Sequence, residues 1–225
     1  MSFAVAFYFD AGGRMFVQMC VKGVGGISPE DAHAILTKRG LACAWWRHAR
    51  HITSAEIAER LTEEELHLHV NAFEEQHPTR SGLVRDESPF ISLTAGSIER
   101  NRFMGRNEVN PAHLVALNFG SGVGQQGDCF LFYCWVLVAH RPSVAVRHLA
   151  EEVRELNTYT RFSWFQPEGE IAAKVEIPAC QIEKFEHYHY GPDNSGRRRI
   201  RRLGGESNPG YISPHEVTNY RDMLR

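Results

Sequence analysis

The sequence predicts an α+β fold in which helices flank a mixed β-sheet. β-Prone apolar stretches recur along the chain, and the longest of them, Cys129–Ala139, has the length of a buried strand. Helix-start signals are concentrated between residues 28 and 65. The strands and helices do not alternate regularly, so a repeated βαβ arrangement is not expected.

The first predicted elements are a hairpin and a short helix. Phe3–Phe9 and Met15–Val21 are apolar and β-prone, and the residues between them include two glycines that suit a turn with positive φ. Ser28 and Pro29 form an N-cap and first helical position, and Gly40 follows the last periodic residue. We therefore expect two strands and then a helix that ends before Gly40.

The next predicted elements are a strand, two helices and a second strand. Leu41–Trp46 is strand-like and ends at Arg47, and capping boxes beginning at Thr53 and Thr62 predict two helices. A turn-rich link over residues 77–88 leads to the short strand Phe90–Leu93. Residues 96–110 are polar and predict a loop.

The second half of the chain is predicted to contain a central strand, a helix, a last strand and a tail. These are Cys129–Ala139, Val144–Leu156 with its helical spacing of apolar residues, and Ile171–Ile177. After Tyr190 the composition turns to Gly, Pro, Asn, Ser and Arg, which suggests an extended tail. We expect one catalytic domain over residues 1–190 and a Gly/Arg-rich extension over residues 191–225.

Composition excludes several classes of protein. The 225 residues fit one domain, and no window holds the roughly 18 unbroken apolar residues of a membrane span. Five cysteines without C-x-x-C spacing argue against a disulfide scaffold and a structural zinc site, and they fit the cytoplasm. The net charge of −2 does not indicate a general nucleic-acid binder.

Three local patterns occur in order along the chain. Trp45-Trp46-Arg47 stands at a predicted strand end, residues 90–94 read Phe-Ile-Ser-Leu-Thr, and residues 168–171 read Glu-Gly-Glu-Ile before another strand. Together they resemble the arginine, Ser-Thr-Ser and Glu-x-Glu signature of toxin-like mono-ADP-ribosyltransferases, including pierisin-like members. The resemblance covers roughly residues 41–185 and implies an ADP-ribosyltransferase-like, split mixed β-sheet core.

The Glu-x-Glu pattern carries the chemistry that the resemblance implies. Alternation along a strand places Glu168 and Glu170 on the same side, facing one cleft. Glu170 would stabilise the oxocarbenium-like state formed when the nicotinamide–ribose bond of NAD⁺ breaks. Glu168 would orient or deprotonate the acceptor, and its being an acid favours arginine as that acceptor. An arbitrary Glu-x-Glu is more often a polar loop before an edge strand.

The resemblance also assigns binding residues. Ser92 would support the catalytic glutamate and Thr94 would share its face, although Ser-Leu-Thr departs from Ser-Thr-Ser. Arg47 would hold the NAD⁺ pyrophosphate, because a guanidinium fork suits a diphosphate. Phe103 and Arg106 resemble the loop that contacts nicotinamide and phosphate. Three other arginines compete with Arg47 for its role: Arg50, Arg80 and Arg85.

Other motifs are weaker. Residues 122–127 match G-x-G-x-x-G, but a β-rich run follows them where a dinucleotide site needs a helix. His67 and His69 diverge on a helix, and His187 and His189 share a strand face without a third ligand, so no metal is expected. The basic run 197–202 is interpreted as a tail, with a nucleic-acid or acidic protein target as the alternative.

These patterns predict an NAD⁺-dependent ADP-ribosyltransferase of the toxin or effector type. NAD⁺ is its substrate, a protein side chain or nucleic-acid base is the acceptor, and an antitoxin or immunity protein is a further expected partner. Two alternatives remain open: NAD⁺ glycohydrolysis, in which water replaces the acceptor, and a non-enzymatic binding module on the same fold, with Trp164 and Phe165 as contacts.

Overall fold

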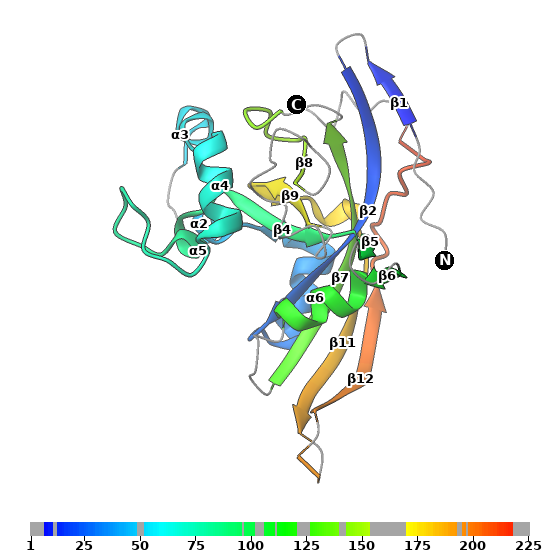
Figure 1. Cartoon of the computed structure of the whole chain (residues 1–225). Coiled ribbons are helices and arrows are strands. Elements are labelled where there is room, and N and C mark those ends of the chain that lie inside the picture. Colours follow the sequence, from blue (N-terminus) through cyan, green and yellow to red (C-terminus); the bar gives the residue numbers. More distant parts are fainter. Residues whose placement is uncertain are drawn as a thin grey trace.

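The strands form one large twisted sheet with helices on both sides of it (Figure 1). The computed structural model describes residues 7–10, 13–48, 52–95, 97–101, 106–110, 112–120, 127–139, 143–153, 170–192, 195–196 and 198–217, with backbone alone for 7–10, 13–15, 97–101, 106–110, 139 and 198.

The large sheet has the strand order β12-β11-β7-β2-β4-β9-β8, and β1 also pairs with β2. Two small two-stranded sheets, β10-β3 and β5-β6, stand apart from it. The strands are β1 (Phe7–Asp10), β2 (Gly13–Gly25), β3 (Leu41–Ala42), β4 (Phe90–Thr94), β5 (Ser97–Asn101), β6 (Arg106–Asn110), β7 (Gly127–Ala139), β8 (Glu151–Glu152), β9 (Glu170–Lys174), β10 (Glu176–Ile177), β11 (Ile182–Pro192) and β12 (Arg198–Ser207).

The helices lie in three places around the sheet. Helices α2 to α5 lie beside β4, the π-helical segment that continues α1 contacts β11, and α6 lies across β2 and β7 (Figure 1). The helices are α1 (Pro29–Ala34), continued by a π-helical segment (Ile35–Arg39), α2 (Ala44–His48), α3 (Ser54–Arg60), α4 (Glu63–Asn71), α5 (Val84–Glu87), α6 (Ala112–Gly120) and a short 3-10 turn (Ala179–Gln181). Within the described residues, no helix is long and apolar enough to span a bilayer.

The sheet is split into two sets of strands. The long strands β2, β7, β11 and β12 lie side by side along a common axis, and β4 and β9 cross that axis at a steep angle (Figure 1). The two sets are joined by a single pair of residues, Val21 on β2 and Thr94 on β4. Every named strand pair described is antiparallel, and an isolated parallel bridge joins Val138 to Ala150. The α+β class with a split mixed sheet and flanking helices is therefore confirmed.

Several local predictions are confirmed by the structure. Asp10 pairs with Gly13 in the predicted hairpin, and the Ser28 side chain accepts from the Asp31 backbone N–H at the start of α1. Thr53 forms the complete capping box with Glu56. β7, which begins at Gly127, follows the glycine-rich residues, so no helix follows them.

The predicted strand over residues 41–46 is wrong beyond Ala42. After the two residues of β3 the chain turns into α2, so Arg47 lies on a helix and not at a strand end. The Cys43 carbonyl accepts from Arg47 N–H at 3.2 Å, and the Cys43 thiol accepts from Trp46 N–H at 3.4 Å. These local hydrogen bonds satisfy backbone N–H groups in the first turn of the helix. A pattern of apolar residues does not reveal such bonds, so the helix was not predicted.

Two further segment predictions are wrong. Residues 97–101 and 106–110 of the expected loop pair as β5 and β6. Residues 144–152 of the expected helix form turns and then β8, and its residues 154–156 lie outside the described residues. Near the start of the expected helix, the carbonyls of Ser143 and Val146 accept from the buried Lys174 ammonium. A charge from another strand thus replaces the helical bonds that the apolar spacing suggested.

Helix α6 was not predicted, and its place depends on close backbone contact. A Cβ added to Gly23 would lie 1.9 Å from the Ala116 carbonyl oxygen, so only glycine admits the helix here. Ala112, Ala116 and Leu117 pack from α6 against Val21 and Leu131. The helix covers the sheet face that β2 and β7 share.

The C-terminal part of the chain belongs partly to the main sheet. β12 pairs with β11 along its whole length, from Pro192↔Arg198 to Lys184↔Ser207. Residues 198–207 are therefore a strand, and the expectation of an extended tail is wrong for them. The backbone of these residues is held by hydrogen bonds to β11, and composition alone does not predict such long-range pairing.

Candidate functional site

Strands β4 and β9 bring three of the predicted site residues together. Thr94 lies directly opposite Glu170, and Ser92 lies opposite Ala172. Alternation therefore places Ser92, Thr94 and Glu170 on one face of this strand pair. Glu170 and Thr94 are buried, with exposed fractions of 7% and 5%.

Helix α4 adds a residue that the sequence did not identify as functional. The Thr62 hydroxyl caps the helix by accepting from Glu65 N–H, and Leu66 and Val70 bury its inner face. His69 lies on that same face, three residues after Leu66, and is 3% exposed. The amphipathic pattern of α4 thus places an imidazole against β4.

His69 joins two serines to the predicted catalytic glutamate. Its Nδ1 lies 2.7 Å from Ser88 Oγ, and its Nε2 lies 2.8 Å from Ser92 Oγ and 3.8 Å from Glu170 Oε1. Phe73 and Phe90 pack against the ring, with centroids at 5.3 and 5.7 Å. We call Ser88, His69, Ser92 and Glu170 the glutamate cluster.

One arrangement of hydrogens satisfies this cluster. Ser88 Oγ already accepts from the Phe90 backbone N–H, so its hydroxyl donates to His69 Nδ1. His69 Nε2–H then donates to Ser92 Oγ, which leaves the Ser92 hydroxyl proton to donate onward. With the opposite tautomer, His69 would donate to Ser88, and the buried Ser88 hydroxyl proton would lose His69 Nδ1 as its acceptor, at a cost in free energy.

His69 is a neutral imidazole at physiological pH. Burial and, to a smaller extent, the nearby positive charge of Lys22 lower its pKa to about 3. The ring therefore holds Ser92 in place without adding a positive charge beside Glu170. The charge of Glu170 must be balanced by other groups.

Two cations lie near the glutamate cluster. Burial lowers the pKa of Lys22 on β2, the carboxylate of Glu170 raises it, and the guanidinium of Arg47 lowers it. Glu170 and Arg47 therefore each lie within electrostatic range of Lys22. Lys22 is partly buried, whereas Arg47 is exposed. The arrangement can hold an anionic group beside a fixed carboxylate.

Helix α2 is held in place by its two tryptophans. The Arg60 guanidinium lies over the Trp45 ring at 4.2 Å, and Arg60 also pairs with Glu87 at 3.0 Å. The Arg147 guanidinium lies over Trp46 at 5.1 Å. These contacts fix the helix that carries Arg47, which gives the aromatic pair a structural role.

The structure separates the predicted site residues into three groups. It brings Ser92, Thr94 and Glu170 together, and it places Arg47 within electrostatic range of Lys22. Glu168 and Phe103 lie outside the described residues, as does Arg50, and Arg106 is described only as the first backbone position of β6. Two competing arginines are engaged elsewhere, Arg80 with Glu65 and Arg85 with Glu74.

Two residues near Glu170 were missed by the sequence analysis. Lys22 is a charge inside an otherwise apolar strand, and His69 is a polar residue on the apolar face of α4. Both patterns are signals of a buried polar site, because such groups are buried only where they find partners. Among described residues, no group of three or more His, Cys, Asp or Glu side chains could hold a metal.

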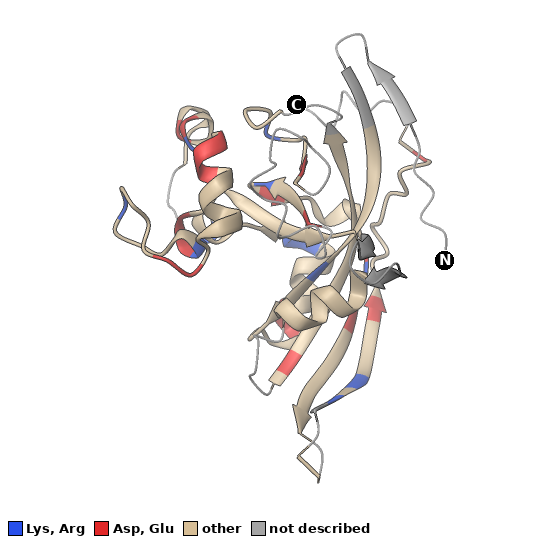
Figure 2. Cartoon of the chain, viewed as in Figure 1, with Lys and Arg blue, Asp and Glu red and all other residues tan. Residues whose placement is uncertain are grey.

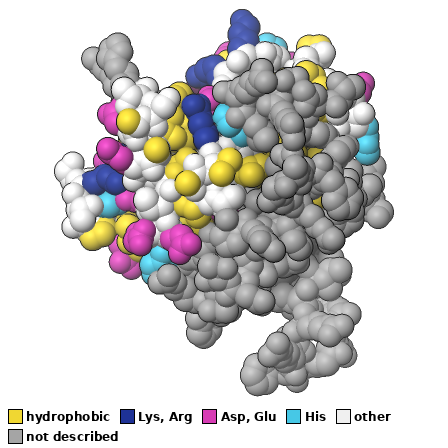
Figure 3. All heavy atoms as spheres, turned by 90° about the horizontal axis from the view of Figure 1, so that it is seen from above, with side chains coloured by type: hydrophobic (Ala, Val, Ile, Leu, Met, Phe, Trp, Pro, Cys, Tyr) yellow, Lys and Arg dark blue, Asp and Glu magenta, His cyan; other side chains and the backbone are white. Residues whose placement is uncertain are grey.

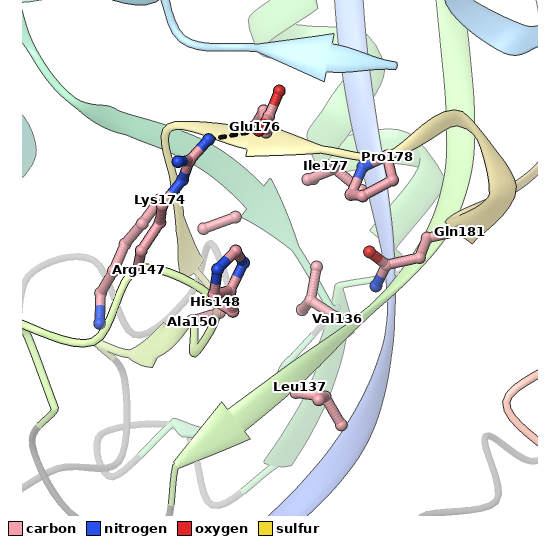
Figure 4. Close-up of a pocket in the computed structure, with 11 residues that line it drawn as sticks. Val136, Leu137, Arg147, His148, Ala150, Lys174, Glu176, Ile177, Pro178 and Gln181 are labelled. Carbon is pink, nitrogen blue, oxygen red and sulfur yellow. Dashed lines mark hydrogen bonds and ion pairs between the residues drawn. The ribbon is translucent and has the colours of Figure 1, made fainter. Parts of the chain in front are cut away.

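A pocket lies away from the glutamate cluster, beyond the other end of β9 (Figure 4). Its volume is about 140 Å³, below the roughly 300 Å³ at which ligand pockets begin. His148 and Gln181 reach into it, and the Arg147–Glu176 ion pair lies at its rim. It is too small for a dinucleotide, and no predicted site residue lines it.

The described charged side chains do not form one large patch of a single sign. Figure 3 shows acidic, basic and histidine side chains interspersed around a hydrophobic area on the face seen from above. Figure 2 shows the acids concentrated on the helices beside β4 and one basic stretch on β12. Electrostatic recognition is therefore local on this molecule.

Comparisons with known proteins give distant structural likenesses. No protein-family model and no curated protein matches the sequence. The chain is similar to EcPltA, with a TM-score of 0.44 and 12% identity over 91% of this chain and 90% of that chain. It is also similar to a nicked CARDS toxin, with a TM-score of 0.39 and 12% identity over 87% of this chain and 31% of the toxin. What the site can do chemically follows from its own residues.

Proposed function

We propose that this protein is an NAD⁺-dependent mono-ADP-ribosyltransferase of the toxin or effector type. The observation that carries the proposal is the Glu170 carboxylate, which is buried 3.8 Å from a neutral His69 and is in electrostatic range of Lys22, on which the charge of Arg47 also acts. A buried carboxylate beside two cations fits a substrate that has a diphosphate and develops positive charge on the adjacent ribose.

Glu170 has the chemical role in this proposal. As the bond between nicotinamide and ribose breaks, positive charge develops on the ribose, and a fixed carboxylate stabilises it. Ser92 and His69 hold that carboxylate in position, because His69 donates to Ser92 while the second serine, Ser88, fixes the ring. Preorganised groups of this kind do not have to reorient during the reaction.

Lys22 and Arg47 have the binding role. Their positive charges would neutralise the pyrophosphate of NAD⁺, with Arg47 as the planar fork that the sequence suggested. Lys22 compensates the Glu170 charge in the free enzyme, as the raising effect of Glu170 on the Lys22 pKa indicates. Thr94, opposite Glu170, adds a hydroxyl to the same face, and Phe103 and Arg106 remain proposed contacts to nicotinamide and phosphate.

The acceptor is proposed to be a macromolecule. Glu168 would orient an arginine side chain, which is favoured over a nucleic-acid base because an acid can hold and deprotonate a guanidinium. The proposal includes action in the cytoplasm and a cognate antitoxin or immunity protein. Replacing Glu168 by Gln should spare NAD⁺ hydrolysis more than acceptor modification.

Labelled NAD⁺ incubated with the full chain and a cell lysate tests this function. Transfer of label to protein or nucleic acid, lost in Glu170→Gln and retained in Glu183→Gln, is the expected result. Glu183 is an exposed glutamate on β11 and serves as a matched control. Protease and nuclease digestion of the labelled product then identifies the acceptor class.

The same assay separates the two alternatives. Nicotinamide release that is independent of any acceptor would indicate a glycohydrolase. No release with wild type, together with intact folding, would contradict the enzyme proposal and favour a binding module.

A further inference from the structure

The small pocket beyond the C-terminal end of β9 has the size of a single aromatic ring. Its volume is about 140 Å³, close to the roughly 150 Å³ of an apolar protein cavity that binds benzene. Pockets for drug-sized ligands are larger, but a one-ring compound does not need that volume. The apolar part of the wall consists of Val136, Leu137, Ala150, Ala173, Ile177 and Pro178. The pocket can therefore enclose one ring in apolar surface.

Two polar side chains, His148 and Gln181, reach into this pocket (Figure 4). Gln181 Nε2 donates to the Trp135 carbonyl at 3.1 Å, which fixes the amide and leaves its Oε1 as an acceptor. Within the described residues, no hydrogen bond engages the His148 ring. Arg147 also lines the pocket, and its Nε is buried without a hydrogen-bond partner in the same part of the chain. The pocket thus brings together polar groups that a ligand can satisfy.

The charges around the pocket are already paired. Arg147 pairs with Glu176 at the rim, and Lys174 pairs with Glu151 away from solvent. Burial and the charge of Arg147 lower the pKa of His148 from its ordinary 6.5, against a raising effect of Glu176, so the ring is neutral at physiological pH. An anionic ligand would find no cation without a partner here, and burying an unpaired charge is costly. The pocket therefore favours an uncharged ligand.

The polar groups of the pocket require both a donor and an acceptor on that ligand. Gln181 Oε1 needs a donor, Arg147 Nε–H needs an acceptor, and the neutral imidazole of His148 offers one of each. A primary carboxamide has a carbonyl oxygen and two N–H groups, so it meets these needs without charge. A six-membered ring attached to it would fill the apolar part of the wall.

We propose that this pocket binds a neutral one-ring carboxamide, with the ring against the apolar wall and the amide toward His148 and Gln181. Nicotinamide is such a compound. That the chain itself releases nicotinamide rests on the proposed function, whereas its binding in the pocket does not. Glu170 lies at the opposite end of β9, so this site is separate from the one where the nicotinamide–ribose bond would break.

Methyl NMR spectra of the full chain, titrated with nicotinamide in the absence of NAD⁺, test this proposal. We expect the methyl signals of Val136, Ala173 and Ile177 to shift, because these residues line the pocket. Leu93, which pairs with Ile171 beside Glu170, reports separately on binding at the glutamate cluster. Nicotinate has the same ring and a carboxylate, and it should bind the pocket about tenfold more weakly because that charge would be unpaired.

Two variants remove the polar groups of the pocket. His148→Phe should weaken nicotinamide binding about tenfold, and Gln181→Met, which is similar in volume, should also weaken it. His113→Phe is the matched control, since His113 is an exposed histidine on α6. Unshifted pocket methyls, nicotinate binding as tightly as nicotinamide, or unchanged binding in both pocket variants would each overturn the proposal. Binding at the pocket without any turnover of NAD⁺ would support the site and contradict only the proposed function.

Discussion

The two ends of strand β9 hold buried charges in different ways. Lys174, at the C-terminal end, pairs directly with Glu151 at 2.7 Å, and both side chains are 0% exposed. Glu170, at the N-terminal end, has an imidazole at 3.8 Å and its cations at longer range. Four residues apart on the same side of one strand, one charge forms a direct buried ion pair and the other lies beside a neutral imidazole.

This difference separates a structural charge from the charge to which we assign the chemical role. Glu151 Oε1 accepts from the Ser143 backbone and hydroxyl as well as from Lys174, which leaves that oxygen no capacity for a ligand. Around Glu170, the imidazole of His69 lies at 3.8 Å, and the charge of Glu170 acts on Lys22. Buried ion pairs hold elements together, whereas buried carboxylates near specific charged partners recur at catalytic sites.

The largest expected effect is on catalysis. Glu170→Gln should lower the rate of ADP-ribose transfer by about 10³-fold, because the neutral amide cannot stabilise the developing charge. The unfolding midpoint in urea should change little, since the two side chains have the same shape. Transfer at the wild-type rate would show that Glu170 is not the catalytic group.

The next effect should appear at the other end of β9. Lys174→Met should lower the free energy of unfolding by about 3 to 5 kcal/mol, because it leaves Glu151 buried without its cation. Urea denaturation measures the loss, and Lys174→Met combined with Glu151→Met should recover part of it. If Lys174→Met alone were as stable as wild type, the Lys174–Glu151 pair would not be a stabilising ion pair, and the two ends of β9 would not differ in the way described.

The stability of the glutamate cluster should depend on pH. His69 has a pKa of about 3 in the folded protein and an ordinary value of 6.5. Between these values only the unfolded chain binds a proton at this position, so the free energy of unfolding falls as pH falls, by at most ~1.4 kcal/mol per unit. His69→Gln should flatten this dependence between pH 6.5 and 5, and an unchanged slope in urea titrations would contradict it.

The smallest expected effects concern NAD⁺ binding. Arg47→Ala should raise the KM for NAD⁺ about tenfold with little change in kcat, because a charge-assisted bond to phosphate is lost. Arg85→Ala is the control, since Arg85 pairs with Glu74 on the surface. Steady-state kinetics of nicotinamide release compare the two variants. Equal KM values would show that Arg47 does not bind NAD⁺ and would leave Lys22 as the one proposed cation in that role.

The fold was predictable where local signals were complete. The hairpin, the first helix, the Thr53 capping box and the strands over residues 90–93 and 129–139 all follow from turn, cap and alternation rules. Predictions failed where distant residues decide the backbone. Lys174 replaces a helix over residues 144–152, and the Gly23 contact admits the unpredicted α6.

The site was predictable only in part. Ser92, Thr94 and Glu170 could be grouped because each stands in a recognisable strand pattern, and strand alternation fixed their common face. His69 and Lys22 were missed because no local motif connects α4 or β2 with β9. Their proximity to Glu170 comes from how the helix and the long strands pack.

By itself, the sequence determined the capped helix starts and the strands over residues 90–93 and 129–139, and it placed an acid at the start of a buried strand. Tertiary structure alone decided that an imidazole from α4 and an amine from β2 surround that acid, and that the basic C-terminal run is a sheet edge. The physical reason is that hydrogen bonds of caps and turns act within a few residues, whereas burial and charge act between any groups that packing brings together.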